Sequence, residues 1–201
     1  MVNNFKRKND KKESILTAAE KIFIEQGYKK TSIAQIAKEA KSSQVTLYKY
    51  FPSKVELART VVIKLIIDGY RQSEEALDNS QDSFIKKMEN IMSYGLNMSN
   101  AINDDFVVFM YNEFSGQNGD RRVRDTYNKY KHGFWKKLLD QGRAEGAVDS
   151  EITDDGAIIY LDMFINYAMS TDPVNPHSAI EIKNHEKDLM HLFFYGIIGR
   201  A

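Results

Sequence analysis

Apolar side chains recur every three or four residues along most of this 201-residue chain. That spacing places them on one face of an α-helix, whereas a half-buried strand would alternate every two residues. Only three prolines interrupt the pattern, and no alternating segments joined by hairpin turns stand out. The sequence therefore predicts an all-α fold of about nine helices. A chain of this length can bury a core without disulfides or a structural metal.

Capping signals locate the first helices. Gly27 follows the first apolar stripe and suits a helix C-terminus, where a left-handed residue is common. Ser32 with Gln35 and Ser53 with Glu56 each match the capping-box pattern, in which side chains three residues apart satisfy free N–H groups at a helix start. The expected helices cover residues 10–26, 32–40, 44–50, 53–77, 82–99, 104–115, 120–145, 153–171 and 178–198.

The composition excludes several classes of function. Without cysteine the chain has no disulfide framework, thiol nucleophile or Cys-ligated metal site. Its four histidines lack metal-binding spacing, and no phosphate loop or nucleophile motif is present. We therefore expect no cofactor, no metal site and no enzymatic activity. No apolar stretch is long enough to span a membrane, so we expect a soluble cytoplasmic protein with no membrane contact.

Charge is divided unevenly between the two ends of the sequence. Residues 1–59 carry 13 lysines and arginines against 6 carboxylates, a net charge of +7, and the remainder carries −7. Such a split indicates that one part of the chain meets a polyanion, although variation on a solvated surface would look the same.

Two short expected helices, 32–40 and 44–50, are separated by Lys41, Ser42 and Ser43. Two helices across a turn of three or four residues form a helix–turn–helix, whose second helix can enter the major groove of DNA. The second helix here is polar on one side, with side chains that can contact base edges, and apolar on the other. A short amphipathic helix packed in an all-helical core is the alternative interpretation of the same pattern.

The segment from Ile15 to Leu57 resembles the N-terminal domain of the tetracycline-repressor (TetR) family of transcriptional regulators. The spacing matches without a gap, most strongly in the run from Thr46 to Lys54. The residues that carry the resemblance are Ile15-Leu16-Thr17-Ala18-Ala19, Phe23, Gly27-Tyr28, Thr31-Ser32-Ile33, Ile36-Ala37, Thr46-Leu47-Tyr48-Lys49-Tyr50-Phe51-Pro52-Ser53-Lys54 and Glu56-Leu57.

The resemblance implies a set of DNA contacts. Base contacts would come from Gln44, Val45, Thr46 and Lys49, together with Ala34, and phosphate contacts from Thr31, Ser32, Tyr48, Tyr50 and Lys54. The chain departs from the family pattern in the turn, where Lys41 replaces a common glycine and Ser42 replaces an apolar residue. Val45 replaces a frequent glycine on the DNA side, so these departures affect which operator is read.

The same resemblance divides the chain at residue 52. Residues 1–52 would form the DNA-binding domain, in which residues 1–9 are a basic flexible arm, and residues 53–201 would bind an effector and dimerise. The arm either contacts DNA or only increases solubility. Candidate pocket residues are Met92, Tyr94, Phe106, Phe109, Met110, Phe114, Phe134, Trp135, Met163 and Tyr167. Candidate residues for the dimer interface are Ile158, Leu161, Ile165, Leu189, Leu192, Phe193 and Ile197.

The resulting hypothesis is a homodimeric repressor that binds a palindromic DNA operator through residues Gln44–Tyr50. A small apolar or aromatic effector would release it by binding more tightly to a state with wrongly spaced recognition helices. The alternative is a helical carrier of hydrophobic molecules that does not bind DNA specifically.

Overall fold

The computed structural model describes the backbone of residues 2–168 and 177–198, and the side chains of residues 6–167 and 177–193. Every regular element within these ranges is a helix, which confirms the predicted all-α fold. The helices are α1 Val2–Gln26, α2 Ile33–Glu39, α3 Gln44–Tyr50, α4 Lys54–Asn79, α5 Phe84–Ala101, α6 Asp104–Ser115, α7 Arg122–Ala144, α8 Asp154–Ala168, α9 Ala179–Asn184 and α10 Glu186–Ile198.

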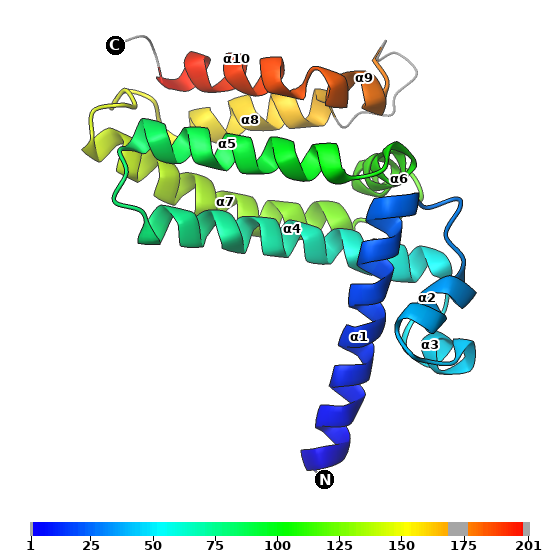
Figure 1. Cartoon of the computed structure of the whole chain (residues 1–201). Coiled ribbons are helices and arrows are strands. Elements are labelled where there is room, and N and C mark those ends of the chain that lie inside the picture. The colour runs from blue at the N-terminus through cyan, green and yellow to red at the C-terminus, as the bar shows by residue number, and fades with distance from the viewer. Residues whose placement is uncertain (1, 169–176, 199–201) are drawn as a thin grey trace.

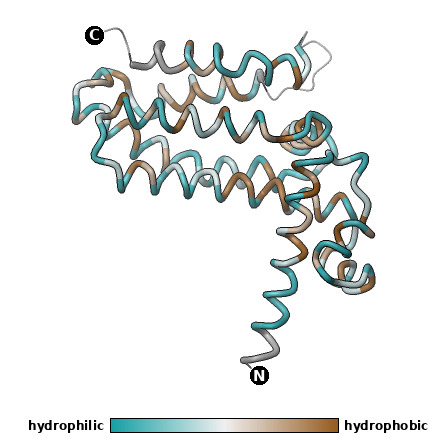
Figure 2. Tube along the Cα trace, viewed as in Figure 1, coloured by the Kyte–Doolittle hydropathy of each residue, from teal (hydrophilic) through white to brown (hydrophobic). Residues whose placement is uncertain are grey.

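The helices form a small N-terminal unit and a larger bundle, and α4 runs from one into the other (Figure 1). Helices α4 and α7 pack along each other inside the bundle, and α8 and α10 lie together on the side away from the N-terminal unit. Helix α1 projects away from the bundle, and its outer end is hydrophilic (Figure 2). The described part of the chain contains no helix that is long and apolar enough to cross a membrane.

The largest differences from the predicted helices lie at the two ends of the chain. The first helix begins at Val2 rather than near residue 10, so the basic residues expected in an arm lie on a helix. Nothing in this segment would end a helix, because it has no proline or glycine and is rich in lysine, a good helix former. The last predicted helix is divided at His185 into α9 and α10, which raises the number of described helices from the expected nine to ten.

The buried side chains form two clusters. The first cluster includes residues on both sides of residue 52, the expected domain boundary. The first cluster joins α1, α2, α3 and the beginning of α4 to α6, through Phe106, Val107 and Phe114. The second joins the end of α4 to α5, α7, α8 and α10. Helix α6 thus completes the core of the N-terminal unit, although it lies beyond residue 52. The division into functional domains at that residue stays a prediction.

Candidate functional site

Helices α2 and α3 form the predicted helix–turn–helix. The capping box at α2 is present: the Gln35 backbone N–H donates to Ser32 Oγ (3.2 Å), and the Ser32 N–H donates to Gln35 Oε1 (2.7 Å). Ser43 caps α3 by accepting a hydrogen bond from the Thr46 N–H (3.1 Å). Both helices therefore begin at fixed residues, which sets the length and direction of the turn between them.

The turn holds Lys41 in the left-handed conformation that glycine favours. Its φ is 47°, and it is the one non-glycine residue with positive φ in the described part of the chain. The Lys41 N–H donates to Lys38 O (3.1 Å) and the Ser42 N–H donates to Ala37 O (2.8 Å), the hydrogen bonds of a Schellman motif. The Ser42 hydroxyl is buried, and no described residue gives it a hydrogen-bond partner. Both departures from the family pattern thus cost stability.

Relieving either cost is expected to stabilise the fold. Lys41→Gly removes the left-handed strain, and Ser42→Ala removes an unsatisfied buried hydroxyl, each raising the free energy of unfolding by about 1 kcal/mol. Urea unfolding followed by circular dichroism would measure the change. Ser43→Ala is the contrasting variant, because loss of a helix N-cap costs about 1 kcal/mol. A lower midpoint for Lys41→Gly would contradict the strain argument.

Helix α3 presents one face to solvent and one to the core. Leu47 is fully buried against α1 and α2, which fixes the rotation of the helix. Gln44, Val45, Tyr48 and Lys49 are exposed on the other side, Val45 by 69% and Tyr48 by 48%. These four predicted contacts therefore share one surface that combines an amide, an ammonium, a phenol and a methyl-rich side chain, the groups that contact base edges and phosphates.

The remaining predicted DNA contacts do not all share this exposure. Ser32 and Ala34 are exposed at the start of α2, and Thr46 and Tyr50 are partly buried. Thr31 is a correction: it is only 2% exposed, and its hydroxyl donates to Gly27 O (2.6 Å), so it fastens the end of α1.

Lys54 is also less available than the sequence suggested. Its ammonium lies 4.3 Å from the centre of the Tyr28 ring and donates to Lys29 O (3.4 Å). Burial lowers the pKa of Lys54 below its usual value. The side chain therefore packs against the end of α1, and a phosphate contact would require it to turn outward.

The end of α1 is fixed against the start of α6. Gly27 has a φ of 84°, and a Cβ there would lie 2.6 Å from Asn103 Oδ1, so both the backbone and the close approach require glycine. The Lys29 N–H donates to Asp105 Oδ2 (2.6 Å), and the Tyr28 ring stacks on Phe109 at 4.3 Å between centroids. A movement of α6 would therefore also displace the segment that leads from α1 into the helix–turn–helix.

A buried ion-pair network joins α4, α6 and α7. Arg59, 7% exposed, donates through Nε and Nη2 to the Glu113 carboxylate, and its Nη1 lies 3.0 Å from Glu56 Oε2 and 2.9 Å from Asp120 Oδ2. Arg122 reaches the same two acids, Glu56 and Asp120, and lowers the pKa of Asp120 to about 2. The predicted capping box of α4 is thus only half formed. Ser53 accepts from the Glu56 N–H, but the Glu56 side chain pairs with the arginines.

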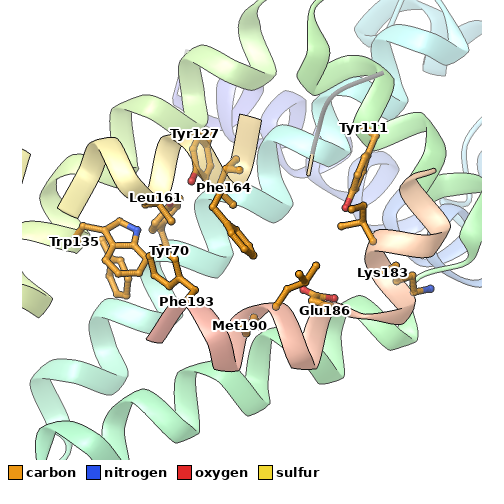
Figure 3. A pocket seen from close by; sticks show the side chains of 14 residues that line it. Tyr70, Tyr111, Tyr127, Trp135, Leu161, Phe164, Lys183, Glu186, Met190 and Phe193 are labelled. Atoms are coloured by element: carbon orange, nitrogen blue, oxygen red, sulfur yellow. The ribbon is translucent and has the colours of Figure 1, made fainter. Parts of the chain in front are cut away.

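A cavity of about 260 Å³ lies in the bundle between α4, α6, α7, α8, α9 and α10 (Figure 3). Its wall is mostly aromatic and aliphatic, which suits an apolar ligand. Burial raises the pKa of the Tyr111 phenol to about 12, and it also raises the pKa of Tyr70 and Tyr127. These three phenols therefore stay neutral at ordinary pH. The lining residues are Tyr70, Tyr111, Tyr127, Phe134, Trp135, Leu161, Phe164, Ile165, Ile182, Lys183, Glu186, Leu189, Met190 and Phe193.

Of the ten predicted pocket residues, Phe134 and Trp135 line this cavity. Phe106 and Phe114 are buried in the first cluster, with Phe109 and Met110 packed against it, because α6 faces the N-terminal unit. Met92 packs against the second cluster without lining the cavity, and the Tyr94 hydroxyl donates to Gln72. Met163 and Tyr167 point outward from α8, 67% and 52% exposed. Tyr127 could have been found in sequence, because it lies on the same stripe as Phe134.

The predicted dimer residues also separate into two groups. Leu161, Ile165, Leu189 and Phe193 line the cavity, and Ile158 is buried. Only Leu192 is strongly exposed, and the side chain of Ile197 lies outside the described residues. The exposed apolar side chains of this side of the bundle are instead Ile159, Tyr160, Met163 and Tyr167 on α8, with Leu192 on α10. We call these five residues the outer apolar face.

The comparisons with known proteins agree with this geometry. Residues 15–61 match the family model described as bacterial regulatory proteins, tetR family. The match covers α2, α3 and the adjoining parts of α1 and α4. Residues 15–61 thus carry the DNA-binding domain of the tetR family. Members of this family are DNA-binding regulators of transcription rather than enzymes.

Individual relatives show how far the similarity extends. HbdR, an HTH-type transcriptional regulator of Aromatoleum sp. (strain CIB), is 39% identical over 72 residues, which cover 36% of this chain and 31% of HbdR. The chain thus matches about a third of the length of that relative. YhgD, an uncharacterized HTH-type transcriptional regulator of Bacillus subtilis (strain 168), is 25% identical over 170 residues, 83% of this chain and 87% of YhgD.

A solved structure of a transcriptional regulator shares the fold over most of the chain. The FadR regulator of Bacillus subtilis, crystallised in complex with stearoyl-CoA, aligns with a TM-score of 0.58 over 92% of this chain and 98% of its own. Its sequence identity of 18% supports a common fold and no more.

Proposed function

We propose that this TetR-family chain is a ligand-responsive repressor that binds a palindromic DNA operator as a homodimer. The observation that carries the proposal is the exposed face of α3, where Gln44, Val45, Tyr48 and Lys49 stand on a helix fixed by the buried Leu47. Such a face on the second helix of a helix–turn–helix fits the major groove. The basic first turns of α1, with Lys6, Arg7 and Lys8, add positive charge for phosphate contacts.

Dimerisation would occur through the outer apolar face. Ile159, Met163 and Tyr167 are spaced four residues apart, so they form one stripe along α8, with Leu192 on the neighbouring α10. Exposed apolar patches of this kind mark protein–protein contacts, and a two-fold axis brings the same patch of two copies together. A dimer would place two α3 helices about one turn of DNA apart, or a multiple of it, as a palindrome requires.

The effector would bind in the aromatic cavity. An apolar ligand suits its walls, and stearoyl-CoA in the B. subtilis FadR structure shows that one protein of this fold binds a long apolar chain. Helix α6 connects the cavity residue Tyr111 to the contacts with Tyr28 and Lys29, so a ligand that favours another position of α6 would alter operator affinity.

Selection of bound sequences from a random pool of duplex DNA tests this function. At about physiological salt, non-specific phosphate binding is weak, and we expect enrichment of a palindrome with half-sites about one or two helical turns apart. The selection is repeated with protein refolded from denaturant, which removes any bound effector. A folded protein that enriches no sequence in either experiment would contradict the proposal.

A further inference from the structure

The charge distribution inside the cavity indicates the chemistry of its ligand. Among the described residues that line it, only Lys183 and Glu186 are charged. They lie at the end of the cavity where α9 meets α10, whereas Tyr70, Tyr127 and Trp135 lie toward the other end (Figure 3). A ligand would therefore place an apolar body among the aromatic rings and a polar group beside this charged end.

The positive charge of Lys183 is already compensated. Its ammonium lies 2.7 Å from Asp104 Oδ1 and donates to Ile102 O (2.9 Å). Figure 3 shows the ammonium turned away from the cavity. Lys183 thus ties α9 to the start of α6, and it would have to give up both contacts to meet an anionic ligand.

Glu186 has no ion-pair partner comparable to the Asp104 partner of Lys183. It is half-buried at the start of α10, and no lysine, arginine or histidine of the described residues forms an ion pair with it. The Ser99 hydroxyl donates to its carboxylate, and the neutral Tyr111 phenol lies on the same side of the cavity. Burial raises the pKa of Glu186, and the Ser99 contact and the positive charge of Lys183, which forms its ion pair with Asp104, offset this effect only in part.

The aromatic wall supplies the second feature. Tyr111 and Phe164 line the cavity together with Glu186, and further rings continue toward Trp135. Ring faces attract a cation, most strongly where water is excluded. A carboxylate without an ion-pair partner and a set of aromatic rings therefore both favour a positively charged ligand.

We propose that the effector is a lipophilic monocation, a protonated amine or quaternary ammonium on an aromatic or alkyl body, whose charge is paired by Glu186. This inference rests on the proposed function, since it takes the cavity to be the effector site. It distinguishes the ligand class from neutral hydrophobic molecules and from anions such as fatty acids, for which Lys183 offers no uncompensated charge.

Calorimetric titration of the full chain with three matched probes tests the inference. The probes are 4-phenylbutyl-trimethylammonium, its neutral analogue with carbon in place of nitrogen, and the 5-phenylpentanoate anion. We expect the cation to bind at least tenfold more tightly than the neutral analogue, and the anion to bind most weakly. Glu186→Gln keeps the shape and the Ser99 contact but removes the charge, so it should lower cation affinity about tenfold and leave the neutral analogue unchanged.

Asp188→Asn is the matched control, because it removes a carboxylate from the same helix at a strongly exposed position outside the cavity. It should leave all three affinities unchanged. Equal affinity for the cation and the neutral analogue, tighter binding of the anion, no cation binding at millimolar concentration, or an unaffected Glu186→Gln variant would each overturn the inference.

Titration does not involve DNA, so it tests the ligand chemistry separately from the proposed regulatory function. Charge-dependent binding without any effect on DNA affinity would therefore contradict the proposed function alone, and an operator response to neutral ligands would contradict this inference alone.

Discussion

Glu113→Ala is expected to lower the free energy of unfolding by about 3 kcal/mol, because the buried Arg59 loses its bidentate partner and keeps only the contacts of its Nη1 with Glu56 and Asp120. For a chain of this length the loss corresponds to a decrease in melting temperature on the order of 10 °C. Both residues are more than nine-tenths buried, so water cannot replace the lost contact. Thermal unfolding followed by circular dichroism would measure the decrease.

Two variants distinguish the buried pair from ordinary surface charge. Glu89→Ala breaks an exposed ion pair with Lys86 and should change stability by less than about 1 kcal/mol. Replacing both partners, Arg59→Met with Glu113→Leu, should recover much of the loss, because two apolar side chains leave no buried charge. A Glu113→Ala protein that melts within about 2 °C of the wild type would refute the assignment of Arg59 as a buried charge dependent on Glu113.

The second large effect is expected at the outer apolar face. Met163→Glu would place a carboxylate in the apolar contact of both subunits and so convert the proposed dimer to a monomer. Operator affinity should fall by at least a hundredfold, because each monomer reads only one half-site. Analytical ultracentrifugation would measure the assembly state, and fluorescence anisotropy the affinity.

Ile85→Glu provides the comparison, since it introduces the same charge at an exposed apolar position of α5. This variant should remain a dimer with unchanged DNA affinity. If Met163→Glu also stays dimeric, the subunits meet through another surface.

The helix–turn–helix could be predicted from sequence because its determinants are local. Ser32, Gln35 and Ser43 fix the helix starts, and the buried position of Leu47 follows from the apolar side of a short helix. The strain at Lys41 and the unsatisfied Ser42 hydroxyl were also visible as departures from a familiar pattern. Thr31 was misplaced because its bond to Gly27 depends on how the chain leaves α1.

The cavity and the subunit contact could not be predicted in the same way. An apolar stripe shows that a helix has a buried face, but the stripe does not identify which neighbour buries it. Helix α6 turns Phe106 toward the N-terminal unit rather than into the bundle. On α8, Leu161 and Phe164 lie on the inner face and line the cavity, whereas Met163 lies on the outer face. Lys183 and Glu186 line the cavity on either side of the break between α9 and α10 at His185, and a continuous helical pattern conceals that break.

The most direct test of the central claim is the affinity of α3 variants for the palindrome obtained by selection. Fluorescence anisotropy at about physiological salt would compare the wild type with Tyr48→Ala and Lys49→Ala, and with Lys86→Ala as an exposed lysine far from α3. If α3 reads the operator, each of the first two variants loses about 1–3 kcal/mol, roughly 5-fold to 150-fold in affinity, and Lys86→Ala binds normally. Folded Tyr48→Ala and Lys49→Ala proteins that bind the palindrome as tightly as the wild type would contradict the account.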